Sequence, residues 1–250
     1  MGYYSLAQQL FRQYPSRSVL SASLMITQSF LYNAIFFTYA LVLTKIYGVP
    51  ATHTGYYFLF FAVGNFVGPV TLGRLFDTLG RRPMISGTYI LSGALLAISG
   101  FMFNAGDLTA TTQTIWWCVI FFFASAGASA AYLTCSVIFP LEVRAKAIAV
   151  FFCIAQSFGA LGPWLYGKLI GAGSDHFLLF VGYLIGAGMM VIGGLVEAAI
   201  GVPAERRALE DVARPLSAVQ KAASTVLSSL PGPAGRRPAG GHLPPPGVPV

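Results

Sequence analysis

The chain has 250 residues, of which 9% are charged and 56% are hydrophobic; its formal net charge is +7 and its mean hydropathy is +0.70. An ordinary soluble domain carries about 25% charged residues, so this chain has too few to cover a surface that faces water. The composition therefore excludes a cytosolic enzyme, a secreted disulfide scaffold and a disordered protein.

Six segments are long and apolar enough to cross a bilayer, which takes about 20 residues each. Because backbone groups in lipid must bond within the segment, we expect helices. The predicted spans are 19–43, 54–73, 84–103, 114–138, 147–170 and 177–200. Residues 1–17 lack a basic region followed by an apolar core, so we expect a cytoplasmic leader there and no cleaved signal peptide.

Positive charge is distributed unevenly between the two sides of these spans. Of the 15 lysines and arginines, only Lys45 and Lys168 fall on one side, and the other 13 fall on the opposite side. The positive-inside rule makes the basic side cytoplasmic. We therefore predict a multi-pass protein of the cell membrane (plasma or inner) with both termini in the cytoplasm. The basic charge reflects topology, so no nucleic-acid partner is expected.

The last 50 residues differ in composition from the rest. From residue 201 onward the chain holds nine of its 15 prolines. Such a segment buries too little apolar surface to fold, so we predict that residues 201–250 form a mostly disordered cytoplasmic tail. The domain that remains is a six-helix transmembrane bundle over residues 18–200.

The second and fifth predicted spans end in the same pattern. Residues 68–75 and 162–169 both read G-P-x-x-x-G-[R/K]-L, and a shift of 94 residues places the first three spans on the last three. The two matching spans cross the membrane in opposite directions. This pattern predicts an all-α membrane protein made of two inverted three-helix repeats. The alternatives are a chance match, or glycines that serve only close helix packing.

The loop after the second span carries a recognisable motif. Residues 73–82, GRLFDTLGRR, resemble the cytoplasmic signature loop of the major facilitator superfamily, G-x-L-x-D-R-x-G-R-[R/K], with Thr78 in place of the usual basic residue. Residues 136–144 and 202–210 are similar to motifs of its sugar porters. Gln28 and Asn33 match the spacing of a third motif. The resemblance covers about residues 15–210.

The resemblance implies half of a twelve-helix transporter, here the C-terminal six helices. The implied function is transport of a small polar metabolite, a sugar or an organic acid, by alternating access. The implied partner is a complementary N-terminal half or a second copy of this chain. A symporter driven by protons would have its coupling acid in the missing half, since Glu197, the only acid inside a predicted span, lies near the span's cytoplasmic end. The alternative is a truncated or regulatory membrane module with no transport activity. We expect no enzyme activity, cofactor or metal.

Polar side chains inside a membrane are costly and mark functional sites. In the family, the first and fourth helices of each half line the central cavity. The predicted substrate-binding residues are Gln28, Tyr32, Asn33, Tyr39, Asn65, Trp117 and Gln156, with Ser129 and Tyr132 beside them. The alternative is that the amides only hydrogen-bond neighbouring helices.

A second group of residues is predicted to control a cytoplasmic gate. The predicted gating residues are Gly73, Asp77, Gly80, Arg81, Arg82, Glu142 and Arg144. We expect the two glycines to permit a tight turn and close helix approach. We expect the charges of Asp77, Arg81, Glu142 and Arg144 to form one cluster that holds a conformation of the gate. The alternative is that the glycines act by turn geometry and the charges only mark topology.

Overall fold

The computed structural model describes residue 8, residues 10–171 and residues 176–202. This part of the chain is helical and contains no β-strand. Its elements are α2 (Pro15–Lys45), the 3₁₀ turn η1 (Ala51–His53), α3 (Thr54–Thr78), α4 (Arg81–Ala105), α5 (Ala110–Val137), α6 (Leu141–Gly159), α7 (Leu161–Gly171) and α8 (His176–Ile200). Six stretches are long and apolar enough to cross a membrane, with α6 and α7 together forming the fifth. The predicted all-α membrane fold is confirmed.

Apart from Lys45 and Lys168, the described basic residues near the ends of the spans gather at one end of the helix bundle. Arg17 lies at the start of α2, Arg74 near the end of α3, Arg82 at the start of α4 and Arg144 at the start of α6. The guanidinium of Arg17 donates to the carbonyl of Ile138 between α5 and α6. We call this end the cationic end. That it faces the cytoplasm remains a prediction.

The predicted leader lies partly, and the predicted tail almost wholly, outside the described part of the chain. Residues 1–7 and 9 lie outside the described part of the chain, but described residues just before α2 pack against α6 and against Phe139 in the link between α5 and α6. The rings of Phe11 and Phe151 lie 5.8 Å apart, and those of Tyr14 and Phe139 lie 6.4 Å apart. Residues 203–250 also lie outside the described part, so the disordered tail remains a prediction.

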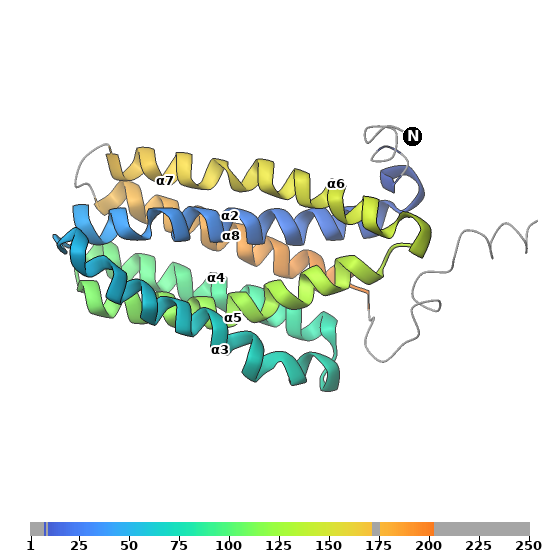
Figure 1. Cartoon of the computed structure of the whole chain (residues 1–250), viewed down its shortest axis with the longest axis horizontal. Helices are drawn as coiled ribbons and strands as arrows, with labels where there is room; N and C mark the ends of the chain where they lie inside the picture. Colours follow the sequence, from blue (N-terminus) through green and yellow to red (C-terminus); the bar gives the residue numbers. More distant parts are fainter. Residues whose placement is uncertain (1–7, 9, 172–175, 203–250) are drawn as a thin grey trace, which may run out of the picture. The chain divides into compact units, whose positions relative to one another are not determined.

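The first helix of each three-helix repeat packs on the second span of the other repeat. α2, the first helix of the first repeat, packs on α6 and α7, which form the second span of the other repeat. In the same way α5 packs on α3, while the third helices of the two repeats, α4 and α8, pack on each other. Figure 1 shows α3 and α7 at opposite edges of the bundle. Inverted three-helix repeats produce this packing.

Glycines bring these packed helices into backbone contact. A Cβ atom on Gly68 of α3 would lie 2.0 Å from the carbonyl oxygen of Phe122 on α5. A Cβ atom on Gly162, at the matching position of α7, would lie 2.9 Å from the carbonyl oxygen of Phe30 on α2. Small residues allow this approach of membrane helices. The first glycine of each repeated motif therefore has a packing role.

The prolines of the repeated motif have unequal effects on their helices. Proline cannot donate to the carbonyl four residues earlier, and its ring crowds that carbonyl. α3 continues through Pro69 to Thr78. The fifth span instead breaks at Ala160, three residues before Pro163, which divides it into α6 and α7. One predicted helix is thus two.

The outermost helices expose large apolar side chains. On α3, Phe60 and Phe66 are 67% and 71% exposed, and Trp164 of α7 is 58% exposed. By contrast, α2 is largely buried among the other helices. These two edges of the bundle must therefore contact lipid or another protein.

Candidate functional site

A polar cavity of about 430 Å³ lies between α2, α3, α5 and α6. Its walls bring together five of the seven predicted substrate-binding residues with Ser129 and Tyr132. The lining residues are Gln28, Ser29, Tyr32, Asn33, Asn65, Pro69, Ser125, Ala128, Ser129, Tyr132, Phe152 and Gln156. None of them carries a charge, so the cavity is polar and neutral.

Gln28 is the least satisfied polar side chain of this cavity. It is 2% exposed, and neither its Nε2 nor its Oε1 has a hydrogen-bond partner among the described residues. Its amide offers two donors and one carbonyl acceptor. Leaving such a group unpaired in the interior costs about 1–3 kcal/mol. The arrangement suits a side chain that bonds a solute.

Gln156 is fixed across the cavity by the polar face of α2. The hydroxyl of Ser29 donates to Gln156 Oε1 at 2.5 Å. Asn33 Nδ2 donates to the carbonyl of Ser29 at 2.8 Å and to Gln156 Oε1 at 3.3 Å. Asn33 and Gln156 therefore already bond within the protein, as amides that join membrane helices do.

A second bond joins α2 to α3 on the other side of the cavity. The hydroxyl of Tyr32 donates to Asn65 Oδ1 at 2.5 Å. Asn65 is also the residue whose backbone carbonyl loses its helical donor at Pro69. The polar face of α2 is thus bridged to α3 through Tyr32 and to α6 through Ser29 and Asn33.

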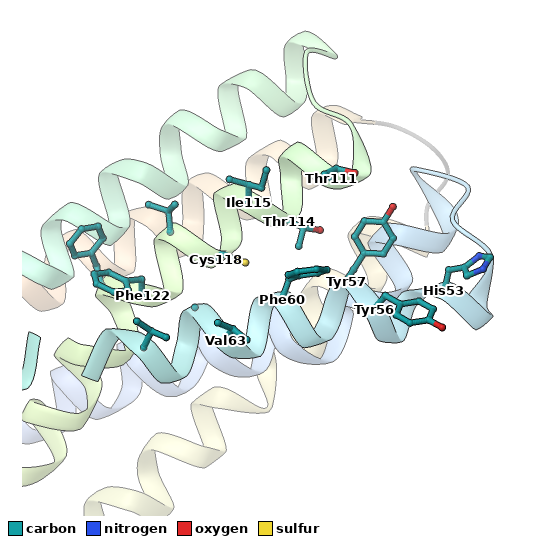
Figure 2. A pocket seen from close by; sticks show the side chains of 14 residues that line it. His53, Tyr56, Tyr57, Phe60, Val63, Thr111, Thr114, Ile115, Cys118 and Phe122 are labelled. Carbon is teal, nitrogen blue, oxygen red and sulfur yellow. The ribbon is translucent and has the colours of Figure 1, made fainter. Parts of the chain in front are cut away.

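A larger but apolar groove of about 980 Å³ runs between α3 and α5. Figure 2 shows Phe60 and Val63 on one wall facing Ile115 and Phe122 on the other, with His53 at one end. The surface of these walls is mostly apolar, although His53, Tyr56, Tyr57, Thr111 and Thr114 also line the groove. The smaller cavity is therefore the better candidate for a polar solute.

The signature loop forms a tight turn between α3 and α4. Gly80 has a φ of 104°, which favours glycine, and it caps the start of α4. Arg81 Nη2 lies 3.8 Å from Asp77 Oδ1, four residues earlier. The Asp77 side chain is 64% exposed, and such pairs contribute about 0–1 kcal/mol. The pair therefore joins the end of α3 to the start of α4 across the turn.

Arg82 joins the signature loop to the end of α8. Its Nη2 donates to the carbonyls of Ala198 and Ala199 at 2.5 and 3.3 Å, and its Nε donates to Ala198 at 3.2 Å. Basic side chains commonly bond the last carbonyls of a helix in this way. Arg82 therefore joins the start of α4 to the end of α8.

The remaining predicted gating residues lie apart from this contact. Arg144 Nε donates to the carbonyl of Phe139 at 3.4 Å, and Glu142 is exposed in the first turn of α6. Nothing lies within 4 Å of a Cβ built on Gly73, so the expectation of a close helix approach there is wrong. The described ion pair of Asp77 is with Arg81, at the start of the next helix, α4.

A family model described as Major Facilitator Superfamily matches residues 21–234 of the 250. The chain belongs to the Major Facilitator Superfamily. This superfamily consists of membrane transporters, so the resemblance of the signature loop and the six apolar helices is confirmed. A search of curated proteins gave no match.

Two predicted site residues of this superfamily member lie outside the cavity. The hydroxyls of Tyr39 and Thr114 lie 3.1 Å apart, and the rings of Tyr39 and Trp117 lie 4.9 Å apart. Both aromatic side chains are 1% exposed, and the ring of Tyr39 also stacks on Phe61. They lie on the expected helices, nearer the end opposite the cationic end, where they form part of the core.

Some cavity residues of this superfamily member were not predicted. Ser29 lies one turn before Asn33, and Ser125 lies one turn before Ser129. Residues four apart share a helix face, so both serines could have been predicted from the polar residues that follow them. Phe152 lies one turn before Gln156 in the same way. The bond from Arg82 to α8 has no such signal, because its acceptors are backbone carbonyls.

Proposed function

We propose that this chain is one half of a secondary transporter that moves a small, neutral, polar solute by alternating access. The observation that carries the proposal is Gln28, a buried amide that lines a cavity and has no partner among the described residues. Membership of a transporter superfamily supports the same function. In this proposal the cavity between α2, α3, α5 and α6 is this half's share of the binding site.

The lining of the cavity favours a sugar or polyol over an organic acid. Amides and hydroxyls, such as those of Gln28, Ser129 and Tyr132, donate and accept hydrogen bonds as sugar hydroxyls do. A buried carboxylate needs a cation or several donors to replace its hydration. None of the lining residues is a lysine, arginine or histidine. An organic acid would depend on cations from the other half.

The partner in this proposal is a second six-helix bundle, either a complementary N-terminal half or another copy of this chain. Ser129, Tyr132 and Gln156 are exposed at the mouth of the cavity. The exposed apolar side chains of α3 and α7 flank it at the two edges. A partner laid across these edges would bury the apolar surface and close the binding site between the two bundles.

Solute binding by the purified full chain in nanodiscs tests the proposal. We expect neutral sugars or polyols to compete with a labelled member of their own class, and mono- and dicarboxylates not to compete. The same preparation, crosslinked and sized, shows whether two copies associate. Binding of carboxylates but not of sugars or polyols would refute the proposal that the cavity binds a neutral solute.

A module without transport activity is the second candidate. The observation in its favour is that Asn33, Asn65 and Gln156 already bond neighbouring helices, as structural amides do. Under this alternative no solute of either class binds, either to the chain alone or after co-expression with a complementary half. Uptake into vesicles by the co-expressed halves would exclude it.

The gate of the proposed transporter depends on Asp77. The pair with Arg81 closes the signature loop, and a contribution of about 1 kcal/mol changes a two-state population about fivefold. In Asp77→Asn we expect near-normal expression and a shift toward the form open at the cationic end. A cysteine reporter in the vestibule at that end measures the shift. Equal labelling rates in the variant and the parent would leave only turn geometry as the role of the loop.

A further inference from the structure

Glu197 on α8 is a carboxyl group without a hydrogen-bond or ion-pair partner in the described part of the protein. Its side chain is fully buried, and neither Oε1 nor Oε2 accepts or donates a hydrogen bond there. Asp77 is the opposite case, since it is exposed and lies beside Arg81. Glu197 is near the cationic end, outside the cavity described above.

Among the described residues, the titratable groups that interact electrostatically with Glu197 come from α4 and α5. They are Arg82, Tyr89 and Cys135. The guanidinium of Arg82 bonds the carbonyls at the end of α8, and the hydroxyl of Tyr89 donates to the carbonyl of Leu24 on α2 at 3.2 Å. Cys135 has the uncharged Ser21 of α2 beside it. None of these groups forms an ion pair or a hydrogen bond with the carboxyl group.

Gly201, the residue that follows α8, lies over this carboxyl group. The amide of Gly201 donates to the carbonyl of Glu197 at 2.7 Å. A Cβ atom on Gly201 would lie 2.7 Å from Glu197 Oε1 and 2.8 Å from Arg82 Cγ. Only a glycine lets the turn sit this close. The turn at Gly201 therefore covers Glu197 from the cationic end.

An ionised carboxylate in this position would lose its hydration without gaining a hydrogen bond. The neutral acid escapes most of that penalty, because burial mainly disfavours charge. We propose that Glu197 is a proton-binding site that holds a proton in this conformation and exchanges it with water at the cationic end when the Gly201 turn lifts. On release the O–H bond of the acid breaks, the proton passes to water and a carboxylate remains; closure reverses these changes.

Only the lifting of the turn rests on the proposed function, because alternating access supplies that movement. The bound proton does not depend on transport. If the chain binds no solute but Glu197 is protonated, the proposed function fails while the proton site stands.

Infrared spectroscopy of the full chain in nanodiscs tests the bound proton. The parent should show the C=O stretch of a protonated carboxyl group at about pH 7, well above the ordinary pKa of glutamic acid at about 4.3. Glu197→Gln should lose this band. Glu142→Gln, the same change at an exposed glutamate, should keep it. A parent without the band, or a Glu197→Gln variant that keeps it, would overturn the proposal.

A pair of glycine variants tests the covering turn. In Gly201→Ala the new methyl group displaces the turn, so we expect the band to weaken at the same pH and its exchange in D₂O to become faster. Gly188→Ala lies in the same helix with nothing within 4 Å and should behave as the parent. If the band and its exchange rate are unchanged in Gly201→Ala, the turn does not control access to the acid.

Discussion

Replacing Gln28 by methionine separates solute binding from folding. The two side chains have similar length and shape, so the change removes the amide without opening a large cavity. If the amide makes two hydrogen bonds to the solute, each contributing about 0.5–1.5 kcal/mol, binding loses about 1–3 kcal/mol. The expected dissociation constant rises about 5- to 150-fold.

Stability should not fall with affinity in this variant. Gln28 has no hydrogen-bond partner among the described residues, so methionine removes an unpaired polar group from the interior. We expect the free energy of unfolding of the solute-free protein to stay the same or to rise by up to about 3 kcal/mol. Thermal unfolding in nanodiscs, with and without solute, measures both effects in one preparation.

Gln113→Met is the matched control, because Gln113 is equally buried but lies outside the cavity. Its Nε2 has no hydrogen-bond partner among the described residues, as in Gln28, but its Oε1 accepts a hydrogen bond from the hydroxyl of Tyr47 at 3.1 Å, so methionine here leaves that buried hydroxyl unpaired. The control should lose about 0.5–1.5 kcal/mol of stability and keep the parental affinity. Our reasoning is refuted if Gln28→Met binds solute as the parent does, or if it is destabilised as Gln113→Met is.

Three further predictions follow from contacts described above. Gly68→Ala places a methyl group against the backbone of α5 and should destabilise the bundle by about 1–3 kcal/mol or more in thermal unfolding. Gly73→Ala, which has open space around it, is the control: in the same assay its stability should be unchanged or should rise by up to about 1 kcal/mol through helix propensity. A cysteine at Asp107 should react with an impermeant reagent added outside intact cells, and one at Gly80 should not; the opposite pattern would reverse the topology. Arg82→Gln weakens the hold on the last turn of α8 and should increase amide hydrogen exchange there at least several-fold, with little change at mid-helix.

Much of the fold could be predicted from the sequence because lipid imposes strong constraints. A span must be helical, apolar and about 20 residues long, so hydropathy located all six. The break at Ala160 could not be predicted, because Pro69 stands in the same motif and leaves α3 continuous. Whether a proline bends or breaks a helix depends on what its neighbours pack against.

The candidate site was predictable in chemistry more than in geometry. The rarity of polar groups in such spans singled out the amides of Gln28 and Gln156, and both line the cavity; their binding of substrate stays a prediction. The sequence did not show that Gln156 bonds α2 while Gln28 stays unpaired, since both are amides with the same capacity. Tyr39 was chosen because it lies on the first helix, but its position along that helix places it in the aromatic core.

The interruption at Ala160 gives the fifth span two separately anchored parts. The segment before it, α6, packs on α2 and more weakly on α5, whereas α7 packs on α2 and α8. The backbone carbonyl of Gly159 has no helical donor at Pro163, so rotation about this joint breaks one hydrogen bond fewer than in a continuous helix. The matching second span, α3, runs unbroken through Pro69 and has no equivalent joint. Sequence symmetry between the repeats therefore coexists with mechanical asymmetry, and a movement at one membrane face need not be transmitted along α6 to the other.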